Sequence, residues 1–291
     1  QPWRVARQAE RTVPDVRPTP FPVPTDARDV SVAPGPAEIF ERAVEEGERR
    51  LEQSTLELAS TGFIAGFTIV FGMAALGIVE AAVAPRFGEV GKVAGALAFG
   101  VGVVFLVVGR AELFNENFYD PVAKAVDEPD SWLVGPLLRL WSFTLAFNLV
   151  GGGLFALVFV VDGALSPGAA SVLAETAQEI AGRDVPAMLA DAIVGGALVT
   201  LLSFLLSAVE GVGSRILLAY AVGALLAVGR FDHVVVTVLH VFLGVLFGAP
   251  VSPRPLATVL VVSTAGNLVG GLGLVTITHV AQAWGARQSG G

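Results

Sequence analysis

Charged side chains stand at two matching places inside long apolar stretches of the sequence. Arg110 and Glu112 lie in the string VGRAELF, and Arg230 and Asp232 lie in VGRFDHV, 120 positions later, where His233 follows directly. Charged groups at membrane depth are expensive unless they pair or line a wet cavity, so they mark ion and substrate paths. Histidine can exchange a proton near neutrality. These residue types at these positions therefore predict either structural ion pairs or part of a path through the membrane.

The carboxylates are also the nearest partners for the arginines. We expect Glu112 and Asp232 to be the partners of Arg110 and Arg230, either within one half of the chain or across the two halves. In that role the four residues act as clamps that close a break in a helix, which we favour over direct contact with a substrate.

The composition restricts the class of protein. The chain has 291 residues, of which 54% are hydrophobic and 15% charged, with a mean hydropathy of +0.71. Soluble domains carry about 25% charged residues. The net charge of −8 provides no basic surface for nucleic acid. The absence of cysteine, with three scattered histidines, indicates no metal site. No nucleophile and base occur in a catalytic pattern, so we expect neither an enzyme nor a cofactor.

Long uncharged runs predict an all-α integral membrane protein with six transmembrane helices. A spanning helix needs roughly 20 apolar residues. The second run stops at Arg110 and the fifth is interrupted at 230–233. The six runs cover 58–79, 93–109, 140–161, 192–209, 216–229 with 234–253, and 255–286.

The rest of the chain completes the domain prediction. Residues 1–36 contain eight prolines and form a disordered cytoplasmic tail. In residues 37–54 apolar side chains recur at helical spacing opposite a charged face, which predicts an amphipathic interfacial helix. The six-helix transmembrane domain is predicted over 55–284, and a short C-terminal tail over 285–291. No apolar run precedes residue 58, so we expect no cleavable signal peptide. If both termini are cytoplasmic, twelve cations lie on the inner side of the membrane and four on the outer side. Because cytoplasmic loops carry an excess of cations, this balance predicts a multi-pass protein of the cytoplasmic membrane with both termini in the cytoplasm.

The two halves of the predicted membrane domain repeat each other. Asn148-Leu-Val-Gly-Gly recurs as Asn267-Leu-Val-Gly-Gly, 119 positions later. Because each half holds three spans, an odd number, the halves cross the bilayer in opposite directions as an inverted 3+3 repeat with helices 2 and 5 broken. Half-helix N-termini at the breaks attract anions. We expect both asparagines to hydrogen-bond the backbone or each other.

Three strings, in order, resemble motifs of the formate/nitrite transporter family. They are Gly109-Arg-Ala-Glu-Leu-Phe114, Arg230-Phe-Asp-His233 and Gly266-Asn-Leu-Val-Gly-Gly271, and the similarity extends from 37 to about 284. Arg110 and Arg230 are unusual in that family, and the strings that contain them resemble a divergent branch of it. The resemblance implies a homopentamer of aquaporin-like protomers in the lipid bilayer, each with a pore for small monovalent weak-acid anions such as formate or nitrite.

The resemblance also implies roles for individual residues. His233 is the central pore histidine, and Leu113 and Phe114 narrow the pore, with Phe231 a further candidate. Asn115 stands where the family usually has threonine, and Thr237 stands where it has asparagine. Arg183 lies near the outer mouth, and we expect Asp191 to cap the fourth span.

Two mechanisms stay open at this point. His233 either exchanges a proton with the permeating acid or acts as a neutral hydrogen-bond donor that positions the anion. Two other functions also stay open. The same fold could carry a different small solute, or the chain could be a non-transporting membrane scaffold that recruits a partner through its N-terminal tail.

Overall fold

The computed structural model describes residues 34–128 and 132–289, which form helices and connecting loops with no strands among them. The predicted tail over 1–36 lies outside the described residues except for its last three positions. The all-α class is therefore confirmed for the part of the chain that can be described.

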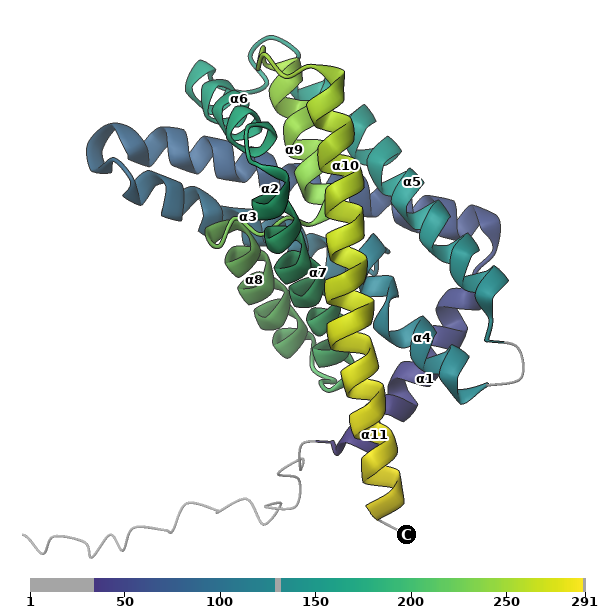
Figure 1. Cartoon of the computed structure of the whole chain (residues 1–291). Helices are drawn as coiled ribbons and strands as arrows, with labels where there is room; N and C mark the ends of the chain where they lie inside the picture. Colours follow the sequence, from purple (N-terminus) through teal and green to yellow (C-terminus); the bar gives the residue numbers. More distant parts are fainter. Residues whose placement is uncertain (1–33, 129–131, 290–291) are drawn as a thin grey trace, which may run out of the picture. The chain divides into compact units, whose positions relative to one another are not determined.

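The helices run in the order drawn in Figure 1. They are α1 (Pro36–Glu52), α2 (Thr55–Phe87), α3 (Val90–Val108), η1 (Phe114–Asn117), α4 (Tyr119–Asp127), α5 (Val134–Phe159), α6 (Pro167–Ala181), α7 (Val185–Ser207), α8 (Val212–Val228), α9 (Val234–Leu246), α10 (Pro253–Leu268), the π-helical turn η2 (Val269–Thr276) and α11 (Ile277–Ser289).

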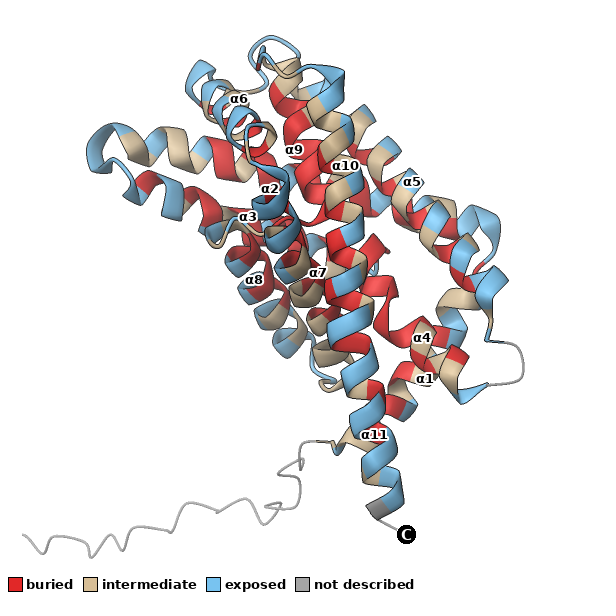
Figure 2. Cartoon of the chain, viewed as in Figure 1, coloured by how far each residue is buried: buried red, intermediate tan, exposed pale blue. Residues whose placement is uncertain are grey.

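Among the described residues, five helices are long and apolar enough to cross a membrane: α2, α3, α5, α7 and the continuous helix Pro253–Gln288. The predicted fifth span is divided into two shorter apolar helices, α8 and α9. Figure 2 shows buried residues on the sides where helices meet and exposed residues on the outer sides. Many exposed side chains are large and apolar, such as Leu217 and Val261, and such a surface suits lipid.

Helix α3 ends in a Schellman motif. The N–H of Ala111 donates to the carbonyl of Leu106 at 3.1 Å, and the N–H of Arg110 donates to that of Val107 at 3.3 Å. Arg110 takes the left-handed conformation, with φ of 53°. The end of α8 repeats both bonds 120 residues later, with Phe231 donating to Leu226 and Arg230 to Ala227. Both helices therefore stop at the same point of the repeat.

An asparagine on α5 holds the backbone where the chain resumes after α3. The side chain of Asn148 accepts from the N–H of Phe114 at 3.0 Å. Its amide nitrogen donates to the carbonyls of Gly62 and Glu112 at 2.8 and 2.9 Å. One fully buried side chain thus satisfies two backbone groups of the interruption, those of Phe114 and Glu112, and ties them to Gly62 within α2.

Asn267 on α10 makes the same three contacts in the second half. It accepts from the N–H of Val234 at 2.8 Å and donates to the carbonyls of Ala192 and Asp232 at 2.8 and 2.7 Å. Of the two alternatives predicted for the asparagines, the structure has the one with backbone partners.

Glycines allow the anchoring helices to approach. A Cβ on Gly66 of α2 would lie 2.0 Å from the carbonyl oxygen of Asn148, and one on Gly196 of α7 would lie 2.4 Å from the Cα of Asn267. These contacts are with backbone, which cannot move aside as a flexible side chain can. The two glycines therefore fix how deeply each asparagine reaches toward its loop.

We predict that Gly66→Ala lowers the free energy of unfolding by about 1–3 kcal/mol, because the added methyl overpacks a backbone contact. Thermal denaturation of the purified protein in detergent measures the change. Gly273→Ala is the control, since nothing lies within 4 Å of that position, and it should leave the midpoint unchanged or raise it. Equal midpoints for the two variants would contradict this packing argument.

We also predict that Asn267→Leu accelerates hydrogen exchange at residues 232–234 and leaves residues 112–114 protected, while Asn148→Leu does the reverse. Each orphaned buried group costs about 1–3 kcal/mol, so the freed loop opens more often. Hydrogen–deuterium exchange read by mass spectrometry checks both variants. Ser263→Ala is the control one turn away, because its buried hydroxyl has no hydrogen-bond partner. Simultaneous opening of both loops in either variant would refute independent anchoring.

Candidate functional site

Two pockets open on different sides of the interruptions. The α6-side pocket has a volume of about 140 Å³, and its lining includes Glu80, Lys92, Glu179, Arg183, Asp232 and His240. The α1-side pocket has a volume of about 420 Å³, and its lining includes Arg49, Arg50, Glu112, Glu116, Asp120 and Ser203. Both pockets combine apolar walls with several charged groups.

The length of helix α8 gives the separation of the two pockets along the helix axis. Arg215 in its first turn lines the α1-side pocket, and Ala227 near its end lines the α6-side pocket. Twelve residues of α-helix rise about 18 Å. Helix α3 contributes in the same way, with Lys92 in the α6-side pocket and Val107 in the α1-side pocket. His233 and Asn115 line neither pocket, whereas their neighbours Asp232 and Glu116 line the α6-side and the α1-side pocket respectively. We call the buried residues after the interruptions that line neither pocket the layer.

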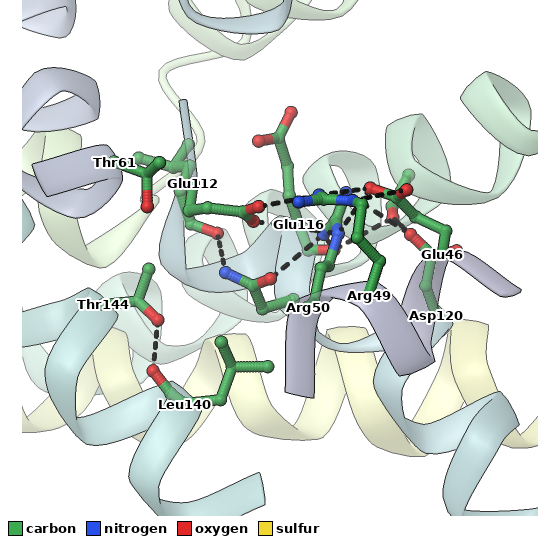
Figure 3. A network of polar contacts seen from close by, with 12 residues as sticks. Glu46, Arg49, Arg50, Thr61, Glu112, Glu116, Asp120, Leu140 and Thr144 are labelled. Atoms are coloured by element: carbon green, nitrogen blue, oxygen red, sulfur yellow. Dashed lines mark hydrogen bonds and ion pairs between the residues drawn. The ribbon is translucent and has the colours of Figure 1, made fainter. Parts of the chain in front are cut away.

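Arginines of α1 enter the α1-side pocket and meet the first interruption, as Figure 3 shows. Arg49 donates to Glu112 at 3.0 Å. Arg50 lies 3.7 Å from the second oxygen of Glu112 and 3.4 Å from Asp120. The predicted pair of Arg110 with Glu112 is wrong, because the buried carboxylate takes its cations from α1 instead.

Glu46 of α1 links the two arginines. It accepts from Arg49 and Arg50 at 2.6 and 3.1 Å. Burial raises the pKa of Glu46, but the hydrogen bonds and charges of the two arginines outweigh that effect and lower the pKa to about 2. A lowered pKa stabilises the folded state above the unfolded value near 4.3, so this contribution is complete at neutral pH.

Arg183 supplies the corresponding cation at the second interruption. It donates to Asp232 at 2.7 Å and to Asp191 at 2.8 Å, whereas Arg230 pairs with Glu179 of α6. The predicted pair of Arg230 with Asp232 is therefore wrong.

Asp191 does not cap the fourth span, as the sequence suggested. Helix α7 begins at Val185 and its N-cap is Asp184, whose side chain accepts from the N–H of Ala187 at 2.9 Å. Asp191 lies within that helix and instead serves as the second carboxylate on Arg183.

His233 occupies the N-cap of α9. Its Nδ1 accepts from the N–H of Val236 at 3.5 Å. A neutral ring in this arrangement carries its proton on Nε2. The side chain is fully buried, and Nε2 has no hydrogen-bond partner among the described residues. The imidazole thus has one nitrogen in use and one available.

Asn115 is the other uncommitted polar side chain of this layer. It is fully buried, and neither its amide oxygen nor its amide nitrogen has a partner in the described chain. Its backbone carbonyl accepts from Thr200 of α7 at 3.2 Å. Thr237, four positions after His233, donates to Asp232 at 3.3 Å and lines the α6-side pocket.

The predicted constriction residues lie beside this layer. Leu113 and Phe114 are buried, and the ring of Phe114 contacts that of Phe118 at a centroid separation of 5.0 Å. Phe231 is half-buried and lines the α6-side pocket. Whether these side chains narrow a pore stays a prediction.

Sequence reasoning missed the contacts of Arg49 and Arg50 with the first interruption. The charged face of their helix was visible as an amphipathic pattern, but nothing in the pattern paired it with residues more than sixty positions later. The structure also places His240 beside Phe99 at a ring separation of 6.0 Å. His240 lines the α6-side pocket, and its Nε2 has no hydrogen-bond partner among the described residues.

Comparisons with known proteins agree with this architecture. The Inner membrane protein YfdC of Escherichia coli (strain K12) is 26% identical over 254 residues, which cover 84% of this chain and 77% of that protein. The solved structure of an "FNT family ion channel" superposes with a TM-score of 0.74 at 17% identity, covering 85% of this chain and 98% of the other. A "Pentameric formate channel with formate bound" gives 0.60 at 18% identity, covering 79% and 98%.

These two likenesses in structure, at low identity, establish the fold. The family profile described as "Formate/nitrite transporter" goes further, because it matches residues 37–281, most of the chain. It also agrees with the prediction of a transporter rather than an enzyme. The chain is a membrane protein that belongs to the formate/nitrite transporter family.

Proposed function

We propose that the chain conducts small monovalent weak acids, such as formic or nitrous acid or their anions, between the two pockets. The observation that supports this most is the buried layer between them, where His233 and Asn115 hold polar atoms without partners. A buried polar group that is left unpaired costs free energy. A small hydrogen-bonding solute passing through the layer can recover that energy.

The architecture of this proposal is an inverted 3+3 repeat with six spans. The matching hydrogen bonds of Asn148 and Asn267 support it, as do the matching Schellman motifs. Spans 2 and 5 are then α3 with α4 and α8 with α9, each interrupted at mid-membrane. Such interruptions are tolerated where protein satisfies the backbone, and the two asparagines do so.

His233 is the central residue of the proposed path. A bare anion meets a large desolvation penalty in an apolar layer, and a neutral acid meets a much smaller one. The Nε2–H of a neutral imidazole can donate to the anion, and an imidazolium can transfer a proton to it. The N-terminal end of α9 adds a positive dipole at the same point.

The assembly and orientation belong to the same proposal. The fold of the pentameric formate channel supports a homopentamer in which each protomer keeps its own path. The cation balance of the sequence supports cytoplasmic termini, which places the α1-side pocket toward the cytoplasm.

We predict that His233→Ala lowers formate uptake into proteoliposomes at least tenfold, because the only imidazole at the interruptions is lost. Wild-type uptake should increase as the external pH falls, because a larger fraction of the acid is neutral. Uptake of radiolabelled formate at pH 5.5 and 7.5 measures both effects.

His279→Ala serves as the matched control, since that histidine lies on α11 and lines neither pocket. It should retain uptake within about twofold of wild type. The weak-acid proposal would be refuted if vesicles with the wild-type protein take up a neutral solute but neither formate nor nitrite. Absence of any flux, with a protein partner bound to residues 1–54, would favour a scaffold.

A further inference from the structure

The α1-side pocket contains three buried carboxylates on one short segment. Glu112, Glu116 and Asp120 follow one another at four-residue spacing, and all three residues are less than 5% exposed. All of them line the pocket. Ionised carboxylates at the mouth of a path would repel an anion before it reached the interior.

Cations for this segment come from α1. Arg50, with its side chain 11% exposed, donates to the backbone carbonyl of Glu116 at 2.6 Å and to the side chain of Asn117 at 3.1 Å. Its guanidinium also lies near the carboxylates of Glu112 and Asp120. A single arginine therefore contacts four residues of the first interruption and the helix that follows it: Glu112, Glu116, Asn117 and Asp120.

Close packing holds α1 in this position. A Cβ on Gly47 would lie 2.1 Å from the backbone oxygen of Asp120, so the helix backbone sits directly on α4. Phe40 of α1 is fully buried in a cluster with Tyr119 of α4 and Val280 of α11. The arginines are thus delivered by a well-packed helix rather than by a surface loop.

The other cations that line the pocket do not replace them, because Arg42, Arg110 and Arg215 form no ion pair with Glu112, Glu116 or Asp120 among the described residues. Glu116 has no arginine or lysine within ion-pairing distance among the described residues, and its carboxylate points away from the guanidinium groups in Figure 3. Arg42 pairs with Glu38 and Glu210 toward the surface. Serines of α7 contribute neutral hydroxyls, as Ser203 donates to Asp120 at 2.9 Å.

We propose that α1 sets the charge of the α1-side mouth, and that Arg49 and Arg50 make the mouth passable to an anion by neutralising the carboxylates of the interrupted segment. The inference rests on the proposed function, because it concerns the same path. It makes Arg50 a specificity-determining residue and α1 a working part of the conduit. With the arginines removed, the mouth keeps its carboxylates and rejects anions.

The second half of the chain supports the proposed role of α1, because there too a cation from another element pairs with the carboxylate of the interruption. Arg183 neutralises Asp232 and Asp191 at the α6-side pocket, and it comes from the loop between α6 and α7. Each interruption therefore has a carboxylate that receives its cation from an element outside the interrupted span. In the first half that element is α1.

The test measures formate flux in proteoliposomes that contain the full chain. Arg50→Met keeps the length of the side chain but removes its charge, and it should lower flux about tenfold or more, the order expected for an uncompensated charge in a medium of intermediate dielectric. Adding Glu112→Gln and Asp120→Asn to Arg50→Met should restore flux to within about threefold of wild type.

Two further variants separate charge from folding. Arg50→Lys should keep most of the flux, because the positive charge is retained. Arg254→Met should stay within about twofold of wild type, because Arg254 is exposed and lines neither pocket. Thermal midpoints of all variants confirm that the protein is folded. Unchanged flux in Arg50→Met, or a loss that neutralising the two acids does not restore, overturns the inference alone. Wild-type vesicles without formate or nitrite flux overturn the proposed function and this inference with it.

Discussion

The structure depends on how a membrane protein satisfies backbone that leaves the helix away from water. Each unpaired N–H or C=O group in such a place costs several kcal/mol, so an interruption is possible only where a side chain takes over the missing hydrogen bonds. Asn148 and Asn267 do this with one acceptor and two donor contacts each. An amide is the one uncharged side chain that can accept and donate twice, which explains the residue type at both positions.

A second constraint is the charge that comes with each interruption. The backbone carbonyls of Glu112 and Asp232 accept hydrogen bonds from the two asparagines, and the side chains of both residues are buried. The cations that pair with these two carboxylates come from Arg49 and Arg50 in one half and from Arg183 in the other. The asparagine hydrogen bonds to the backbone are the same in both halves, whereas the cations that pair with the carboxylates come from different elements. The sequence repeat therefore includes the asparagines but not the arginines that pair with the carboxylates.

This difference explains what could be predicted from the sequence. The apolar runs and the repeated asparagine strings predicted membrane helices, the places where they stop, and the residues that hold the breaks, because each is encoded locally or at a constant offset. The partners of Glu112 and Asp232 were assigned to the nearest arginines and were wrong. Closeness in sequence does not predict the ion-pair partner there. Arg110 has a left-handed backbone conformation, and Arg50 reaches the interruption from a separate, packed helix. Hydrophobic periodicity carries no information about which charged face meets which carboxylate.

The two left-handed arginines illustrate how the repeat combines both constraints. A non-glycine residue in this conformation costs roughly 1–2 kcal/mol, and glycine is usual at this point of a Schellman motif. Here glycine comes one position earlier, and Arg110 and Arg230 adopt φ of 53° and 56°. Arg230 pairs with Glu179 across the α6-side pocket, and Arg110 lines the α1-side pocket. Each arginine therefore lies beside one of the two pockets, and at both positions the sequence places a cation where a Schellman motif usually has glycine.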